Sequence, residues 1–180
     1  FEKNPGFKIT AGMLHRLVKA IMVGDVLMRV LYRTRPYEAV PGSANQLYEK
    51  WNAVAEQMFA EGITFGKYNK LIKNIIRDFD NLPIREDIKK PKVGIVGEIL
   101  VKFSPTANNH LVDLLEKEGA EAVVPDLLDF FLYCFYNQEF KVDNLGAKKS
   151  SAKKTKLGIK ACEWLRKAAR EEFEKSKRFN

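Results

Sequence analysis

The sequence contains few of the side chains that hold metals or form crosslinks. It has two cysteines, Cys134 and Cys162, and two histidines, His15 and His110, among 180 residues. Two cysteines cannot build a disulfide framework, which indicates a reducing compartment, the cytoplasm. The cysteines lack Cys-x-x-Cys spacing and the histidines lie far apart in the sequence, so we expect no metal ligands in this chain.

Long apolar runs are also missing. The most apolar stretch near the start, residues 13–31, is interrupted by Arg16, Lys19, Asp25 and Arg29. A helix that spans a bilayer needs about 20 consecutive, predominantly apolar residues. A secretory signal would need an apolar segment followed by a small-residue cleavage site, and none is visible. We therefore expect no membrane partner.

Acidic residues are scarce in the last part of the chain. Residues 1–140 carry 18 basic and 18 acidic side chains, whereas residues 141–180 carry 13 basic and 5 acidic ones. The formal net charge of +8 therefore belongs to the last 40 residues. This distribution argues against a uniformly basic fold that binds nucleic acid with its core.

The basic residues 146–156 have two interpretations. They could contact phosphates in a salt-sensitive way, which would make the chain a binding module for nucleic acid or for an acidic partner. The cluster has no interleaved aromatic residue and no recognition motif, so we favour an exposed linker and consider nucleic acid an unexpected partner. The lysines concerned are Lys148, Lys149, Lys153, Lys154 and Lys156.

Apolar residues at helical spacing predict three helices in the first half of the chain. The first is expected from an N-cap at Thr10 to about Arg33, and the second from residues 41–43 to Gly62. The third is expected over residues 66–81. Its predicted inward side chains are Tyr68, Leu71, Ile72, Ile75, Ile76 and Phe79. Short loops between these helices predict one helical unit over residues 1–88.

The next segment alternates between strand and helix patterns. Residues 92–97 predict a buried strand, and Ser104 with Pro105 predicts the start of a helix that ends at Gly119. Residues 120–125 predict a second strand, and Asp126 is expected to cap a helix that is apolar nearly all round. This β-α-β-α order is typical of half a doubly wound domain and defines a Rossmann-like segment over residues 89–145.

The predicted fold class is therefore α/β. We expect an N-terminal helical unit, a partial Rossmann-like three-layer segment with a small parallel sheet, and a basic linker with a C-terminal helix over residues 146–180. Two parallel strands do not form a stable sheet alone. Further strands must come from other segments of the sequence or from chain outside it. Because the sequence begins with Phe1 rather than Met, we expect a segment of a longer parent.

The loop after the first predicted strand is the candidate binding site. In open α/β sheets, ligands bind beyond the carboxyl ends of the strands, and helix N-termini hold anions. A plain strand-to-helix turn, with Glu98 solvated or paired with Lys102, is an equal alternative. Neither G-x-G-x-x-G nor a phosphate-binding Walker motif is present, and no catalytic residue can be assigned. The candidate residues are Gly97, Glu98, Ser104, Asn108 and Asn109.

Two further features have competing interpretations. The polar cluster of residues 33–38 could bind an anion, but we favour arginines that pair with carboxylates such as Glu38 and bind helix carbonyls. Cys134 stands among aromatic residues, where a buried, inert thiol is the favoured interpretation. A nucleophilic pair of Cys134 with His110 has no supporting motif.

Several motifs carry a resemblance to a known family. KVGIVGEILVKFSPTANN (residues 92–109), EGAEAVVP (118–125) and DFFLYC (129–134) resemble the large activator-related proteins of the 2-hydroxyacyl-CoA dehydratase system. TRPYE (34–38) and LYE (47–49) are similar to the middle region of these proteins. The resemblance covers residues from about 10 to 140, and its longest motif is the most specific.

The resemblance implies a role within a larger protein of anaerobic metabolism. In this family an ATP-driven activator with a [4Fe-4S] cluster sends one electron to a dehydratase component, which has its own [4Fe-4S] cluster and removes water from a 2-hydroxyacyl-CoA. This sequence is similar to the dehydratase-like module only. The implied partners are the rest of the parent chain and an acyl-CoA substrate, and the isolated segment is expected to have no activity and no cofactor of its own.

Overall fold

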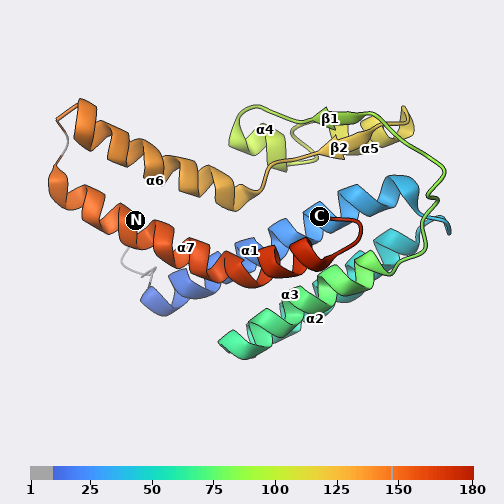
Figure 1. The fold of residues 1–180 in the computed structure, drawn as a ribbon, viewed down its shortest axis with the longest axis horizontal. Coiled ribbons are helices and arrows are strands. Elements are labelled where there is room, and N and C mark those ends of the chain that lie inside the picture. The colour runs from blue at the N-terminus through green and yellow to red at the C-terminus, as the bar shows by residue number, and fades with distance from the viewer. Residues whose placement is uncertain (1–9, 147) are drawn as a thin grey trace.

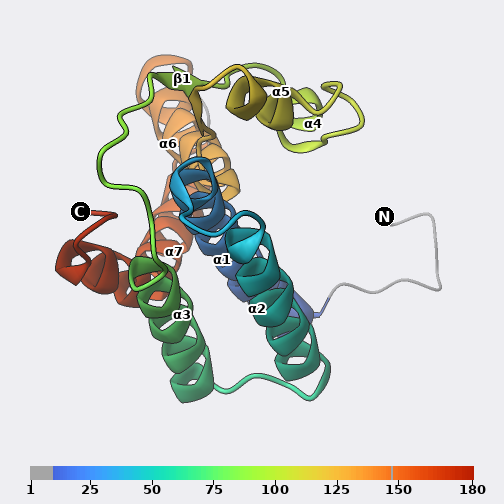
Figure 2. The same ribbon diagram turned by 90° about the vertical axis from the view of Figure 1, so that its right-hand side faces the viewer.

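The computed structural model describes residues 10–146 and 148–180, with only the backbone of residues 149–154. Residues 1–9 of the predicted helical unit lie outside the described residues. Helices make up most of the structure, and a small parallel sheet lies near the C-terminal end of the first helix (Figures 1 and 2). The elements are α1 (Ala11–Thr34), the 3-10 helix η1 (Arg35–Tyr37), α2 (Ser43–Ala60), α3 (Phe65–Asp80), β1 (Lys92–Gly94), α4 (Ile99–Phe103), α5 (Leu111–Lys117), β2 (Glu121–Val123), α6 (Leu127–Asn144) and α7 (Lys149–Lys175).

The first three helices agree with the sequence pattern. Thr10 is the N-cap of α1, where its hydroxyl accepts a hydrogen bond from the Met13 amide at 3.2 Å. Helix α3 packs against α1, α2 and α7. All six residues predicted to face inward from α3 are buried, which confirms the apolar period of this helix: Tyr68, Leu71, Ile72, Ile75, Ile76 and Phe79.

The predicted basic linker is wrong for most of its length. Helix α7 begins at Lys149, so residues 149–156 form its first turns. Helices α6 and α7 run side by side, as Figure 1 shows, and α7 also packs against α3. The Tyr68 hydroxyl donates to the Leu165 carbonyl at 3.1 Å, which joins α3 to α7 in the core.

Helix α6 is less buried than its apolar sequence predicts. Leu128 and Leu132 are its buried residues. Among the described elements, its main packing partners are α7 and α1. Cys134 is exposed, and the expectation of a buried thiol is wrong.

The sheet is smaller and more exposed than predicted. Strands β1 and β2 are parallel, with Val93 opposite Ala122, which confirms a mixed α/β structure with a small parallel sheet. Each strand has three residues, and β1 is exposed throughout, so the prediction of a buried first strand is wrong. Strand β1 is exposed because α1 packs mainly against β2, and β1 is not one of its main contacts.

The helix predicted from Ser104 to Gly119 is replaced by the shorter helix α5, and a separate short helix, α4, lies before Ser104. Helix α4 begins earlier, because the Glu98 carboxylate accepts from the Leu100 amide at 2.8 Å and caps it. Ser104 is then the C-cap of α4 rather than the N-cap of a following helix. Asn109 and His110 both have φ of 54°, a left-handed conformation that separates α4 from α5.

The N-terminus of α6 is capped from another helix. Asp126 occupies the N-cap position but makes no capping hydrogen bond, so the sequence-based assignment is wrong. The carboxylate of Asp25 on α1 accepts from the Leu127 amide at 2.8 Å and from the Leu128 amide at 2.9 Å. Asp126 instead pairs with Arg29 of α1 at 2.5 Å. These contacts fix α6 to the middle of α1.

Within the described part of the chain, no helix is both long enough and apolar enough to cross a membrane.

Candidate functional site

A cavity of about 440 Å³ lies between the α1–α2 corner and the α4–α5 segment. It therefore joins the two regions that the sequence marks as polar clusters, residues 33–38 and the loop after β1. Its apolar wall includes Met28, Leu31 and Phe103. Its polar lining consists mainly of Tyr32, Arg35, Asn45, Tyr48, Glu49, Lys102, Asn108, His110 and Asp113.

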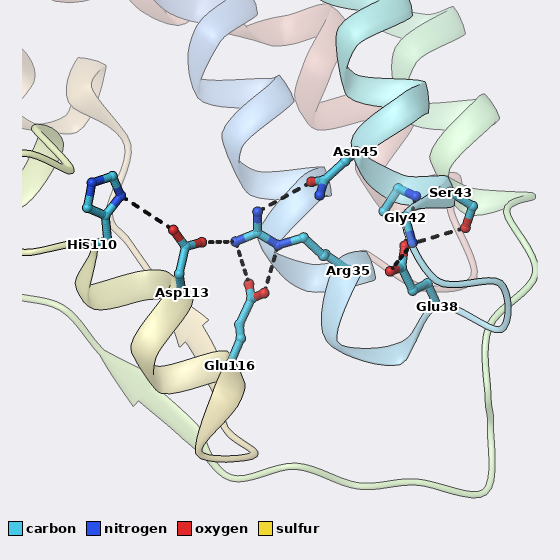
Figure 3. Close-up of polar contacts among 9 residues, drawn as sticks. Arg35, Glu38, Gly42, Ser43, Asn45, His110, Asp113 and Glu116 are labelled. Atoms are coloured by element: carbon cyan, nitrogen blue, oxygen red, sulfur yellow. Dashed lines mark hydrogen bonds and ion pairs between the residues drawn. The ribbon is translucent and has the colours of Figure 1, made fainter.

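Arg35 connects the two sides of this cavity (Figure 3). Its Nε and Nη2 bond both carboxylate oxygens of Glu116, at 2.7 and 3.1 Å. Its Nη2 also bonds Asp113 at 3.0 Å, and its Nη1 bonds the Asn45 side-chain oxygen at 3.3 Å. The planar guanidinium thus bridges α2 and α5, a geometry that lysine cannot reproduce.

Burial changes the acid–base behaviour of this cluster. Burial raises the pKa of Glu116 above its ordinary value, although the hydrogen bond and charge of Arg35 act in the opposite direction. Burial also raises the pKa of Tyr32, whose ring lies 5.6 Å from the Arg35 guanidinium. The cavity therefore has a fixed cation, Arg35, and two neutral phenols, Tyr32 and Tyr48, and the carboxylate of Glu116, which is not part of the lining, bonds this cation.

The predicted arginine–Glu38 pair does not form. Glu38 accepts instead from the Gly42 amide at 2.6 Å and the Ala44 amide at 2.9 Å, so it caps the start of α2 (Figure 3). Arg35 finds its carboxylates on α5, more than 75 residues along the chain. Arg33 donates to the Phe179 carbonyl at 3.1 Å. The arginines therefore have structural partners, but their main carboxylate partner was wrongly predicted.

Of the five candidate residues, Asn108 lies in the wall of this cavity. Its amide donates to the Val101 carbonyl at 2.9 Å and accepts from the Leu111 amide at 3.1 Å, so it joins α4 to α5. The Ser104 hydroxyl accepts from the Ala107 amide at 3.4 Å within the same connection.

The other candidates lie around the cavity rather than in its wall. Gly97 precedes α4 with φ of 141°, Glu98 caps that helix, and Asn109 is an exposed left-handed residue. These positions follow from the early start of α4, because the Glu98 carboxylate accepts hydrogen bonds from the first backbone amides of this helix. The structure thus places Asn108 in the same cavity as Arg35 and leaves Gly97, Glu98, Ser104 and Asn109 outside its lining.

Sequence reasoning missed the acidic half of this cluster. Asp113 and Glu116 are three residues apart on α5 and so share one helical face. Their three-residue spacing within the short helix α5 was the signal in the sequence for an acidic face. Their partner could not be identified from sequence, because Arg35 lies on a different element.

The cysteines and histidines do not form a cluster. Cys134 is exposed on α6, whereas Cys162 is buried in the core, where burial raises the pKa of its thiol. Among the described residues, no group of three or more His, Cys, Asp or Glu side chains is placed to hold a metal ion. A [4Fe-4S] cluster commonly takes four thiolates, and this sequence has two cysteines, so its residues do not fit such a group.

The basic residues of the last segment belong mostly to a helix. Lys149, Lys153 and Lys154 lie in the first turns of α7, and their side chains are outside the described part of the structure. Lys148 and Lys156 are exposed. Contact of these lysines with nucleic acid or an acidic partner stays a prediction.

Comparison of the chain with known protein families, with curated proteins and with solved structures found no match.

Proposed function

We propose that this chain is a segment of the dehydratase-like module in a large activator-related protein of the 2-hydroxyacyl-CoA dehydratase system. In this proposal it is a scaffold: its Rossmann-like part forms one wall of a site that further chain completes. ATP, [4Fe-4S] clusters and the acyl-CoA substrate belong to the parent protein, and the segment alone is catalytically silent. The motifs of residues 92–109 and 118–125 motivate the family assignment.

The observation that supports this proposal best is the incomplete burial of a parallel sheet. Sheets of parallel strands are ordinarily covered on both faces. Here Val93 is 36% exposed, Val123 is 42% exposed, and Val96 beyond β1 is 83% exposed. Leu100 on α4 and Leu114 on α5 are also exposed. Such a group of apolar side chains around open strand edges favours cover by additional structure.

In this proposal the cavity around Arg35 is the binding surface of this wall. It lies beside α4 and α5, the two helices that follow β1. Its polar groups come from α1, η1 and α2 on one side and from α4, α5 and their connection on the other, so the helical unit and the α/β part both contribute to it. A ligand that enters it would contact Asn108 and His110 on one side and Asn45 on the other.

Amide hydrogen exchange tests whether further chain completes the sheet. The isolated chain is compared with the longer natural protein that contains it. We expect the amides of β1 and β2 to exchange about 10–100-fold more slowly in the longer protein, because added strands and cover would protect them. The amides of the buried helix α3 are the internal control and should exchange equally. Equal exchange of β1 and β2 in both proteins would contradict the scaffold role.

Anaerobic reconstitution with iron and sulfide tests whether the chain is silent toward clusters. We expect no stoichiometric uptake and no visible iron–sulfur absorption, since only Cys134 offers an exposed thiol. Cys162→Ala is the matched control for Cys134→Ala. Stoichiometric cluster formation that is lost in Cys134→Ala and kept in Cys162→Ala would show that the chain is a cluster protein rather than a scaffold.

A further inference from the structure

A second cavity, of about 470 Å³, gathers basic residues from three distant parts of the chain. It lies between η1, the connection from α3 to β1, and the residues that follow α7. Its lining contains six basic side chains and two acidic ones, Glu86 and Glu121, for a formal charge of +4. The basic residues are Arg33, Arg85, Lys89, Lys90, Lys92 and Arg178. We call this cavity the basic groove.

The floor of the basic groove is held in place by hydrogen bonds. The Tyr37 hydroxyl donates to the buried Glu121 carboxylate at 2.8 Å, and Lys92 lies 3.7 Å from the same carboxylate. Arg178 donates to the Leu82 carbonyl at 2.7 Å, and Arg33 to the Phe179 carbonyl. These contacts to carbonyl oxygens hold the guanidinium groups of Arg33 and Arg178 at the groove.

The rim of the basic groove has cations without carboxylate partners. Of the six basic residues, Arg33 and Lys92 lie within 4.0 Å of a carboxylate among the described residues. In both cases the carboxylate is that of Glu121. Arg85, Lys89 and Lys90 form no such ion pair in that part of the chain. The fold therefore concentrates positive charge that nearby carboxylates compensate only in part, which costs stability through mutual repulsion.

The chemistry of the groove selects a multiply charged anion. A charge of +4 matches an oligophosphate better than a single carboxylate, and arginine and lysine are the side chains that bind phosphate oxygens. The volume lies within the range of small-molecule sites, roughly 300–1,000 Å³. Tyr37, Ile84 and Ile88 add an aromatic and apolar wall for an attached organic group.

We propose that the basic groove binds a small molecule that carries two or more phosphate groups. Arg85, Lys89 and Lys90 supply the contacts to the phosphates, while Arg33 and Arg178 set the positive potential from the floor. This role is independent of the scaffold function proposed above, because it uses neither the lining of the cavity around Arg35 nor the exposed valines of the sheet.

Equilibrium binding of inorganic tripolyphosphate tests the proposal. We expect saturable binding at one site near physiological salt, weakened at least about 10-fold in the triple variant Arg85→Gln, Lys89→Gln, Lys90→Gln. The matched control is Lys67→Gln, Lys70→Gln, Lys160→Gln, which removes the same charge from exposed positions outside the groove. We expect the control to bind as the unchanged chain does. Circular dichroism verifies that both variants are folded.

Further probes identify the source of the phosphates. Tighter binding of adenosine triphosphate than of tripolyphosphate supports a nucleotide, and equal binding supports the phosphate chain itself. Absence of saturable binding, or equal weakening in both triple variants, overturns the proposal. Tighter binding of a single-stranded oligonucleotide than of either probe, with the same loss in the groove variant, also overturns it in favour of nucleic acid.

Discussion

Replacement of Arg35 by alanine is expected to lower the free energy of unfolding by about 3 kcal/mol. The variant leaves the Glu116 carboxylate, whose side chain is 13% exposed, without the cation that compensates its burial. It also removes the bonds from Arg35 to Asp113 and Asn45, and with them the link between α2 and α5. Chemical denaturation followed by circular dichroism measures the loss.

The neighbouring acids provide the controls for this prediction. Asp113→Asn should cost less than about 1 kcal/mol, because the Asp113 side chain is 60% exposed and its pair with Arg35 is accessible to solvent. Arg35→Ala combined with Glu116→Leu should recover part of the loss, since no buried charge is then left unpaired. If Arg35→Ala were as mild as Asp113→Asn, the cluster would be a surface feature rather than the connection that shapes the cavity.

The helical elements were predictable because their determinants are local. The α3 pattern places six apolar residues on one face, and Thr64 caps the helix with its hydroxyl near the Lys67 amide at 3.4 Å. Helix α1 is also determined locally, because its N-cap, Thr10, directly precedes its first residue. Periodicity and caps of this kind are contained within about 20 residues of sequence.

The α/β part departed from prediction where a competing cap or a distant contact decided the structure. Ser104 and Pro105 are a valid helix start, but Glu98 caps an earlier helix that ends at Ser104. Asp126 is a valid N-cap, but Asp25 occupies the amides that it would have bonded, and Asp126 pairs with Arg29. Neither outcome can be read from local sequence, because both alternatives satisfy the local rules.

The candidate site was predictable only in part, for the same reason. Asn108 belongs to the loop that the strand pattern marked, and the structure places it in the cavity. The contact of Arg35 with Glu116 spans 81 residues. Likewise, the basic groove combines Arg33, Arg85 and Arg178, whose positions show no cluster in the sequence.

Asp25 is expected to make the stability of the chain depend on pH between about 4 and 7. Burial raises the pKa of this carboxyl from 3.8 to about 7. The amides of Leu128 and Leu127 lower that pKa, and the charges of Asp126 and Asp129 raise it further. The unfolded chain releases this proton near pH 4 and the folded chain near pH 7, so the folded state binds more protons in between.

The contribution of Asp25 is thus fully present below pH 4, is lost as the pH rises to about 7, and is constant above it. The loss is on the order of 4 kcal/mol, since each unit of pKa difference corresponds to about 1.4 kcal/mol. Asp25→Asn removes this titration, so denaturation of both chains at pH 5 and pH 8 should show the variant gaining about 2–3 kcal/mol relative to the unchanged chain, the part of the loss that falls above pH 5.

Asp129→Asn is the matched control for the titration of Asp25. Asp129 lies in the first turn of α6 near the same amides, but its side chain is 45% exposed. Its replacement should keep the titration of Asp25 and reduce it only slightly, because the charge of Asp129 is the smallest of the causes that raise the pKa of Asp25. A constant difference between Asp25→Asn and the unchanged chain across this range would mean that Asp25 ionises normally. The cap of α6 would then bind its two amides as an ordinary carboxylate at every pH above 4, and α1 would hold α6 with equal strength throughout.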